Sequence, residues 1–366
     1  MKILWLSPNF NHYKARFLNN FAKEDGIDLT ILSGSGRIGK GDLEIEENWN
    51  FKLIKSNVPK SKFGISIKII RIIFKDFSNY DWILIPAEKK NIFLFMLLRL
   101  LRLISKKTKL VSYNHPLLQS RHGKITKMDV LITKFYYRKL DRVIFYTKSA
   151  CEFAIKNKLV QREKAFWANN TLDNTEIEKH YTYKVLNNRK FTFLFIGRMI
   201  ENKKLEVLFD YFEYLKKTIK DKELSLELIG DGPMSSLVKS ACLKDKSIHW
   251  HGLLINEMEI APVMKRANVI FIPGHSGLSI NHAMMYGRPY ITIKAKTHAP
   301  EISYLKSGIN GFELSGDKEK DLHDLTKIIL DDTMLQKCSE NAMLTGKELS
   351  VDKWVEQMKF NFNSTT

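Results

Sequence analysis

Cysteine is scarce in this chain. Cys151, Cys242 and Cys338 are far apart among 366 residues, and none belongs to a Cys-x-x-Cys pair. Small secreted domains hold themselves together with several closely spaced cysteines, and that pattern is missing here. We therefore expect a reduced, cytoplasmic protein without a disulfide framework.

Long hydrophobic runs are missing as well. Residues 1–6 are too few for the core of a signal peptide and lead into polar sequence. The longest apolar run, residues 92–104, contains Arg99 and Arg102 and stops well short of the roughly 20 residues that span a bilayer. No membrane-spanning segment is expected, and no internal repeat or low-complexity segment stands out.

Acidic residues are few in one half only. Residues 1–174 carry 32 Lys and Arg against 15 Asp and Glu, a net charge of +17. Residues 175–366 carry 27 against 25, a net charge of +2. So uneven a charge suggests an anionic partner for the first half, either nucleic acid or anionic lipid.

Two stretches of the first half place basic residues at helical spacing beside an apolar face. They are Lys68, Arg71 and Lys75 within residues 62–77, and Arg99, Arg102 and Lys106 within residues 92–107. Basic faces backed by Ile, Leu and Phe favour interfacial helices on an anionic membrane surface, although ordinary solvated helix faces give the same pattern. Nucleic acid is not expected as a partner, because no reading motif occurs and aromatic residues do not alternate with the basic ones.

Short apolar runs alternate with helical patterns along the whole chain. We expect strands at 2–6, 27–32, 82–86, 109–113, 142–146 and 165–168, and again at 191–196, 224–229, 247–250, 269–272 and 290–293. Helical periods separate most of them, which indicates an α/β fold of parallel strands with crossover helices. The chain is too long for a single hydrophobic core of ordinary size, and residues 174–190 have the composition of a polar linker. Two Rossmann-like halves are therefore predicted.

A glycine-rich stretch in the first half resembles two phosphate motifs. Residues 34–39 match G-x-G-x-x-G, and residues 34–40 nearly match a P-loop, in which Gly41 replaces the final Ser or Thr. Neither motif opens a convincing helix, because acidic residues follow at 42–47. A surface loop is the interpretation, with a nucleotide role as the alternative.

The second half carries a series of motifs at the ends of its expected strands. In order they are Gly197-Arg198 with Lys203, Gly230-Asp231-Gly232-Pro233, Trp250-His251-Gly252, and PGHSGLSINHAMMYGRP at residues 273–289. In these motifs the chain resembles the GT-B glycosyltransferases of glycosyltransferase family 4, throughout its second half and by topology in its first. The resemblance implies two Rossmann-like domains that face each other across a cleft: residues 1–178 with 351–366 for the acceptor, and 185–350 for a nucleotide-sugar donor.

Arg198 and Lys203 are the expected catalytic cations. Two cations at the carboxyl end of a strand can neutralise a diphosphate leaving group without a metal, and the resemblance gives the matching Arg and Lys this role. Lys204 occupies a position where the family commonly has glycine, so the catalytic lysine is either Lys203 or Lys204. For Gly197, and for Gly230, Asp231 and Gly232, the resemblance implies donor binding, with a purely structural turn as the alternative for Asp231.

The stretch 273–289 departs from the family pattern EGFGLxxxEAMAxGxP. Aligned on Gly277 and Leu278, it has Gly274 and His282 in place of the two glutamates. In the family the first glutamate acts near the donor sugar, so here His275 or a backbone group is expected to take that contact. The second binds the ribose hydroxyls; His282 is expected to do so as a neutral imidazole, or else to be a buried histidine with its hydrogen bonds satisfied.

Further donor and acceptor residues follow from the same resemblance. Ser279 opens the helix that presents backbone N–H groups to the diphosphate. Glu301 is expected at the sugar or ribose hydroxyls, with a helix-capping role as the alternative. In the first half, His115 matches the family histidine that faces the donor sugar, with a core histidine as the alternative. The acceptor-side wall is assigned to Asn11, His12 and Tyr13, where the family's Gly-Gly is missing.

The resemblance implies a glycosyltransferase that retains anomeric configuration and transfers a sugar from a nucleotide-diphosphate sugar, with a UDP-sugar favoured. No Asp-x-Asp motif occurs, so neither a metal nor another cofactor is expected. The expected acceptor is lipid-linked or a polysaccharide, of the O-antigen or capsule type, and the cationic half suggests a cytoplasmic protein held peripherally on the inner face of the membrane. The alternatives are a non-catalytic nucleotide-sugar-binding subunit, and a sugar-nucleotide epimerase or phosphorylase of the same fold.

Overall fold

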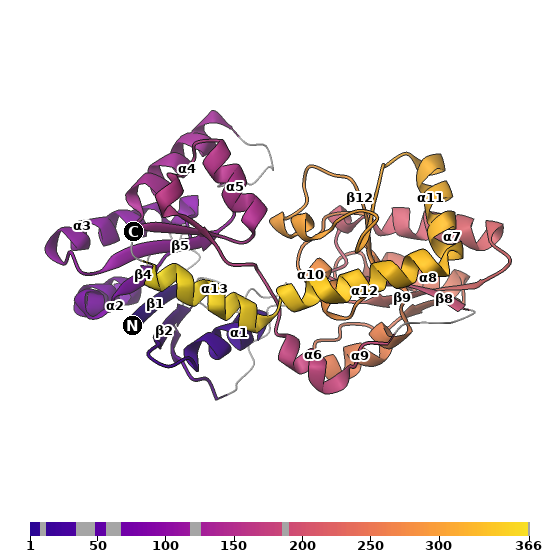
Figure 1. Cartoon of the computed structure of the whole chain (residues 1–366), viewed down its shortest axis with the longest axis horizontal. Coiled ribbons are helices and arrows are strands. Elements are labelled where there is room, and N and C mark those ends of the chain that lie inside the picture. Colours follow the sequence, from indigo (N-terminus) through magenta and orange to yellow (C-terminus); the bar gives the residue numbers. More distant parts are fainter. Residues whose placement is uncertain (8–11, 34–47, 56–66, 118–125, 185–189, 365–366) are drawn as a thin grey trace. The chain divides into compact units, whose positions relative to one another are not determined.

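The computed structural model describes residues 1–7, 12–33, 48–55, 67–117, 126–184 and 190–364. The chain forms two compact units. The first comprises Met1–Asn170 together with Val351–Thr366, and the second Thr171–Ser350. Each unit is a parallel sheet with helices packed on its faces (Figure 1).

The sheet of the first unit has seven strands in the order β3-β2-β1-β4-β5-β6-β7, all paired in parallel. The strands are β1 (Lys2–Ser7), β2 (Asp28–Ser33), β3 (Lys52–Lys55), β4 (Trp82–Leu84), β5 (Lys109–Asn114), β6 (Arg142–Phe145) and β7 (Ala165–Trp167). The strand order reverses between β1 and β4, and ligands of such sheets bind beyond the carboxyl ends of the strands near this point.

Helices of the first unit contribute to two separate hydrophobic cores. The first core includes buried residues of α2 (Ile67–Asp76), α3 (Ile92–Ile104), α4 (Lys127–Lys139) and α5 (Lys148–Lys156). The second includes buried residues of α1 (His12–Ala22) and α13 (Val351–Asn363). In α3 the buried residues Leu94, Leu98 and Leu101 are three or four positions apart, the spacing that places side chains on one helix face.

The last helix of the chain returns to the first unit. Trp354 of α13 is fully buried, and its ring lies edge-on to that of Phe17 at 4.7 Å between centroids. The indole N–H of Trp354 donates to the Tyr113 hydroxyl at 3.2 Å, so a buried polar group keeps its partner. Helix α13 therefore lies next to α1 and fixes the chain terminus to this sheet (Figure 1).

The sheet of the second unit has six strands in the order β10-β9-β8-β11-β12-β13, again all parallel. The strands are β8 (Lys190–Ile196), β9 (Glu223–Ile229), β10 (Ile248–Trp250), β11 (Val269–Phe271), β12 (Tyr290–Ile293) and β13 (Gly311–Leu314). The order reverses between β8 and β11, so the loops after these two strands stand at the switch point where ligands are expected.

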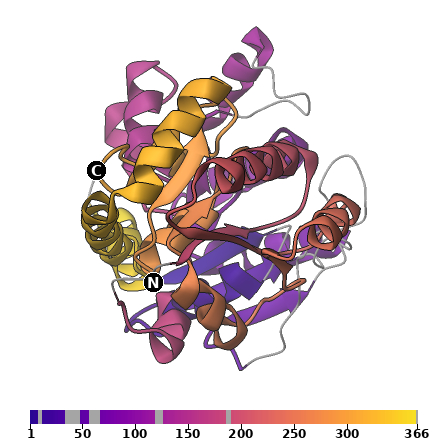
Figure 2. The same cartoon turned by 90° about the vertical axis from the view of Figure 1, so that its right-hand side faces the viewer.

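Helices cover both faces of this sheet. They are α6 (Asn174–His180), α7 (Leu205–Thr218), α8 (Ser235–Lys244), α9 (Glu257–Arg266), α10 (Ser279–Met285), α11 (Lys318–Leu330) and α12 (Asp332–Glu348). Helices α7 and α11 pack together on one side, and α6 and α9 on the other (Figure 2).

The two parallel sheets confirm the fold class expected from the sequence, and two details differ or fall outside the structure. The polar stretch interpreted as a linker begins with α6, because the Asp173 carboxylate accepts a hydrogen bond from the Thr175 N–H and caps the helix. The glycine-rich stretch at 34–40 lies outside the described residues. Within the described ranges, no helix is both long and apolar enough to cross a bilayer.

Candidate active site

The loops after β8, β9 and β10 are joined by backbone hydrogen bonds. The Gly197 N–H donates to the Ile229 carbonyl at 3.0 Å. The Met199 N–H donates to the Asp231 carbonyl at 2.9 Å. These loops therefore form one continuous surface at the carboxyl edge of the sheet, where the sequence motifs had indicated a donor site.

Gly230 and Gly232 are required by the close approach of these loops. Gly230 has φ +134°, and a Cβ atom there would lie 1.9 Å from the Gly197 carbonyl oxygen. Gly232 has φ +155°, and a Cβ atom there would lie 2.5 Å from the Met199 carbonyl oxygen. L side chains rarely adopt such backbone angles, so both glycines are explained by the packing of one loop on the other.

Asp231 is exposed and holds the turn that begins α8. Its Oδ1 accepts hydrogen bonds from the Gly232 N–H at 2.7 Å and from the Ser235 hydroxyl. These two hydrogen bonds lower the pKa of the Asp231 carboxyl below its usual value. The contacts are those of a structural turn, which was the alternative interpretation of this residue.

Lys203 is a buried cation. It ends the 3₁₀ turn Glu201–Lys203, is 8% exposed, and donates from Nζ to the His275 carbonyl at 2.6 Å. Burial, and next the positive charge of Arg198, lower the pKa of the Lys203 ammonium to about 8. The charged form is thus disfavoured by the site as it stands, and a bound anion would relieve this cost.

Arg198 directly follows the loop glycine Gly197 and is exposed. Within the described part of the chain, its guanidinium makes no ion pair or hydrogen bond. Arg198 and Lys203 are nevertheless close enough for one charge to depress the pKa of the other. The carboxyl end of β8 therefore carries two positive charges, and the described residues supply Arg198 with no carboxylate partner.

The backbone distinguishes Lys203 from Lys204. Lys204 is exposed and has φ +56° and ψ +50°, a left-handed conformation that glycine adopts at little cost. This is the position at which the family commonly has glycine, while Lys203 is the residue whose ammonium lies beside the Gly197 loop. Of the two lysines, Lys203 is the one placed beside this loop, and its catalytic role stays a prediction.

Gly274 lies against the backbone that carries Lys203. Its N–H donates to the Lys203 carbonyl at 3.1 Å, and the His275 N–H donates to the Asn202 carbonyl at 2.8 Å. A Cβ atom on Gly274 would lie 2.1 Å from the Asn202 carbonyl oxygen. No side chain fits at 274 in this backbone, so the family's first glutamate has no equivalent at this position.

Two histidines line the same loops. The His275 Nδ1 is bonded to the Thr297 carbonyl, which requires an N–H there. The His298 Nδ1 accepts from the Ser276 N–H at 3.1 Å, so its Nε2 carries the proton and donates to the Ile293 carbonyl at 2.9 Å. Burial lowers the pKa of both imidazoles, which are therefore neutral at pH 7.

The other expected donor residues lie at the start of α10 and in the loop around Glu301. Leu278 is the residue that precedes this helix, and a Cβ atom on Gly277 would meet nothing closer than the Ala299 Cβ at 3.9 Å. The Ser279 hydroxyl lies 2.9 Å from the Tyr290 hydroxyl. Glu301 is 3% exposed and close enough to His275 to act on its pKa.

His282 is hydrogen-bonded to a carboxylate that was not among the expected site residues. It is 5% exposed, and its Nε2 lies 2.9 Å from Oε1 of Glu257, at the start of α9. The Tyr286 hydroxyl donates to the other oxygen, Glu257 Oε2, at 2.7 Å. The geometry is that of a buried histidine with a satisfied hydrogen bond, the alternative interpretation, and it brings a carboxylate next to the position where the family has one.

In the first unit, His115 directly follows β5. It is exposed, and its ring lies edge-on to that of Tyr146 at 4.8 Å. Its carbonyl accepts a hydrogen bond from the Tyr137 hydroxyl at 2.8 Å, which holds the strand end in place. Of the acceptor-side residues, Asn11 lies outside the described residues. His12 and Tyr13 are the first residues of α1, and their side chains are likewise not described.

No three His, Cys, Asp or Glu side chains of the described ranges are grouped as metal ligands. The residues that the structure brings together in the second unit are Arg198, Lys203, Gly274, His275 and Glu301. Glu257 and His298 were not among the expected site residues. Glu257 bonds His282 and Tyr286, and His298 bonds the backbone of Ser276 and Ile293, contacts that no spacing in the sequence indicates.

The second unit matches a known family. Residues 190–332 match Glycosyl transferases group 1. A relative, the uncharacterized glycosyltransferase MJ1059 of Methanocaldococcus jannaschii, is 23% identical over 362 residues that cover 87% of this chain and 85% of the relative.

Solved structures share the fold of this chain in full or in large part. Anabaena Alr3699/HepE in complex with UDP-glucose has a TM-score of 0.67 at 16% identity, with 100% of both chains covered. A structure of S. aureus TarM with Fondaparinux, alpha-GlcNAc-glycerol and UDP has a TM-score of 0.55 at 14% identity. It matches 71% of this chain, which spans only about half, 52%, of the TarM chain.

Fold and motifs together define the class. Its two parallel-sheet units match GT-B glycosyltransferase structures, and its second unit contains a glycosyltransferase group 1 domain. The protein is a glycosyltransferase. The enzyme class expected from the motifs is thereby confirmed.

Proposed function

We propose that the second unit binds the diphosphate of a UDP-sugar at the carboxyl end of β8, as in glycosyltransferase family 4. The observation that carries this proposal is the proximity of two cations, Arg198 and Lys203. Lys203 is a buried ammonium whose pKa is depressed to about 8. A diphosphate carries the opposite charge and accepts charge-assisted hydrogen bonds from both groups. UDP is favoured because Anabaena HepE, which shares the fold, was solved in complex with UDP-glucose.

The other contacts of the donor are assigned around this pair. Gly197, Gly230 and Gly232 shape the loop surface beneath the diphosphate, and Asp231 holds one of those loops. Shortly after Gly274 and His275 in the chain, the N–H groups of Gly277, Leu278 and Ser279 are assigned to the diphosphate. His275 replaces the first family glutamate as the sugar contact. Glu301 takes hydroxyls of the sugar or ribose. Because Glu257 holds the Nε2 of His282, a ribose hydroxyl would be bound through the other ring nitrogen, Nδ1.

The proposed reaction is transfer with retention of configuration. The bond from the anomeric carbon to the donor phosphate oxygen breaks, and a bond to an acceptor hydroxyl oxygen forms on the same face. The leaving phosphate takes the acceptor proton, while Arg198 and Lys203 stabilise the charge that develops on the diphosphate. His115 of the first unit is assigned a contact with the donor sugar. Arg198 and Lys203 neutralise the diphosphate, as a metal ion does in other glycosyltransferases.

The first unit is proposed to take a lipid-linked or polysaccharide acceptor in surface glycan synthesis. Its charge supports a peripheral location on the anionic inner face of the cell membrane, since residues 1–174 carry a net charge of +17. Asn11, His12 and Tyr13, which follow or begin the segment after β1, are the proposed acceptor-side residues.

Thermal-shift titration tests the donor site directly. UDP, GDP, ADP and their sugars are added to the wild type, to Arg198→Ala and to Lys203→Met. The wild type is expected to be stabilised most by UDP and a UDP-sugar, and each variant to lose most of that shift. The matched control is Lys204→Gly, which removes a positive charge one residue away and relaxes a left-handed backbone; it should keep the wild-type shift. Equal shifts in Lys203→Met and Lys204→Gly would disprove the assignment.

A further inference from the structure

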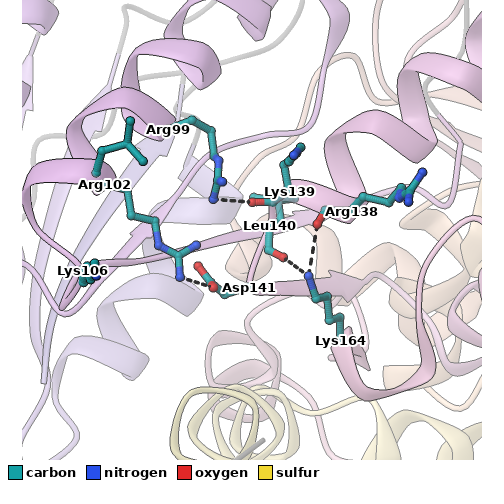
Figure 3. A pocket seen from close by; sticks show the side chains of 9 residues that line it. Arg99, Arg102, Lys106, Arg138, Lys139, Leu140, Asp141 and Lys164 are labelled. Atoms are coloured by element: carbon teal, nitrogen blue, oxygen red, sulfur yellow. Dashed lines mark hydrogen bonds and ion pairs between the residues drawn. The ribbon is translucent and has the colours of Figure 1, made fainter.

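The first unit contains a basic pocket at the amino edge of its sheet. Its volume is about 420 Å³. It is lined by Arg99, Arg102, Leu103, Lys106, Arg138, Lys139, Leu140, Asp141 and Lys164 (Figure 3). Asp141 directly precedes β6, and Lys164 directly precedes β7, so the pocket lies at the opposite sheet edge from His115, which follows β5.

Two of these cations donate hydrogen bonds to backbone carbonyls at the end of α4. Arg99 donates from Nη1 to the Lys139 carbonyl at 3.1 Å. Lys164 donates from Nζ to the carbonyls of Arg138 and Leu140, both at 3.1 Å (Figure 3). Carbonyls in the last turn of a helix lack partners within the helix, so Arg99 and Lys164 act as caps.

The other four cations of the lining do not cap any helix of the described ranges. Arg102 pairs with Asp141 at 2.5 Å, and this is the single carboxylate of the lining. Lys106, Arg138 and Lys139 are exposed, and their side chains form no ion pair with any described residue. The pocket therefore has a surplus of positive charge that attracts anions.

An apolar face stands beside these cations on α3. Leu100 is 59% exposed, Leu103, which lines the pocket, is 73% exposed, and Ile104 is 85% exposed. Met96 and Phe93, about one and two turns before Leu100, are also exposed. Because the opposite face of α3 is buried in the core, these side chains form an apolar strip directed at solvent, with Arg99 and Arg102 along its flank.

A second exposed apolar face lies on α4. Met128, Leu131 and Phe135 of this helix are exposed and recur at spacings of three and four. Phe135 lies edge-on to Phe95 of α3 at 6.3 Å, so the two helices are in contact. Exposed apolar side chains on adjoining helices, next to unpaired cations, have the composition of a membrane-binding face.

We propose that α3 and the end of α4 dock on an anionic phospholipid bilayer, with a headgroup phosphate in the basic pocket. The apolar side chains of α3 enter the boundary between headgroups and acyl chains, and Lys106, Arg138 and Lys139 meet the anionic surface. A soluble polyanion would account for the cations but not for the exposed leucines, and an apolar protein partner would leave the surplus charge unmatched. This inference locates the membrane contact of the proposed function in particular residues.

Vesicle co-sedimentation of the full chain tests the proposal. Phosphatidylcholine vesicles with and without phosphatidylglycerol are compared at low ionic strength. The wild type is expected to bind the anionic vesicles preferentially, and added salt should weaken the binding. Lys106→Gln combined with Arg138→Gln should lower the partition coefficient roughly 30-fold, and Leu100→Gln combined with Leu103→Gln should lower it as well.

Matched controls lie on the second unit. Lys244→Gln with Lys337→Gln removes the same charge, and Leu243→Gln with Leu344→Gln replaces similarly exposed leucines; both should bind as the wild type does. The docking proposal fails if neutral vesicles bind equally well, if the controls lose binding to the same extent, or if the protein binds heparin but no vesicles. The UDP-dependent thermal shift of the same variants should be unchanged. Vesicle binding by a protein that binds no nucleotide would refute the donor proposal and leave the docking proposal standing.

Discussion

Lys203 carries a charge that its surroundings disfavour, and this gives the donor site a characteristic pH dependence. The pKa of Lys203 is depressed to about 8, chiefly by burial. The cationic form is the one that binds a diphosphate. We therefore predict that kcat/KM for the donor falls by about tenfold per pH unit above pH 8. In Lys203→Arg the fall should move to higher pH, because guanidinium stays charged. A wild-type profile that stays flat well above pH 8 would contradict this role.

Stability should change in the opposite direction over the same range. The pKa of Lys203 is lower in the folded chain than its ordinary value of 10.5, so between pH 8 and 10.5 the unfolded chain binds more protons at this residue. The contribution of Lys203 to the free energy of unfolding therefore rises with pH in this window, by on the order of 3 kcal/mol in total. Urea denaturation of the wild type and Lys203→Met should show this rise as a difference between the two proteins.

At the residue scale, the sequence predicted types of residue better than their contacts. Arg198 and Lys203 were predicted because cations at a strand end suit a diphosphate. The sequence left Lys203 and Lys204 as alternatives, and they differ in the structure by burial and by the left-handed backbone of Lys204. His282 was predicted with two roles. Its hydrogen bond to Glu257 could not be foreseen, because that residue is on another helix and no spacing pattern links the two.

At the scale of elements, the segment that follows β11 is fixed to the turn that carries Lys203. A Cβ atom on Gly274 would lie 2.1 Å from the Asn202 carbonyl oxygen, whereas one on Gly277 would meet only the Ala299 Cβ at 3.9 Å. We predict that Gly274→Ala lowers the free energy of unfolding by about 1–3 kcal/mol, since the backbones must separate. The matched control Gly277→Ala should cost much less.

Urea denaturation of both glycine variants measures this difference. Gly274→Ala should also weaken UDP binding, because the displaced backbone carries Lys203. Equal unfolding free energies for the two variants would show that the backbone contact at Gly274 is not tight, and the explanation for the missing glutamate would then be lost.

Elements with strong periodicity were predictable, and those decided by capping or pairing were not. The apolar run at 92–104 is α3, with the same bounds. The stretch interpreted as a linker begins with α6, because Asp173, the residue directly before it, caps that helix. The short strands β3 and β13 were missed, since four residues at a sheet edge carry too little alternation to stand out.

At the scale of the whole molecule, the alternation of apolar runs and helical periods was enough to predict two parallel sheets. The strand orders could not be derived from that alternation, because the reversal beside β1 and again beside β8 depends on which strands pair across long connections. The return of the chain to its first unit depends on the buried Trp354, whose indole meets the Tyr113 hydroxyl 241 positions away in the sequence. A contact of that separation carries no local pattern, so the assignment of residues 351–366 to the first domain came from the family resemblance alone.

In the proposed reaction, Arg198 and Lys203 stabilise the nucleotide diphosphate as the sugar leaves. The most direct measurement is the rate at which the purified protein releases UDP from UDP-sugars in the presence of glycan acceptors. We predict that the wild type releases UDP and transfers the sugar, and that Arg198→Ala and Lys203→Met each reduce kcat by about 10²–10³-fold, while Lys204→Gly stays close to the wild type. Release at the wild-type rate by either cation variant would contradict the account.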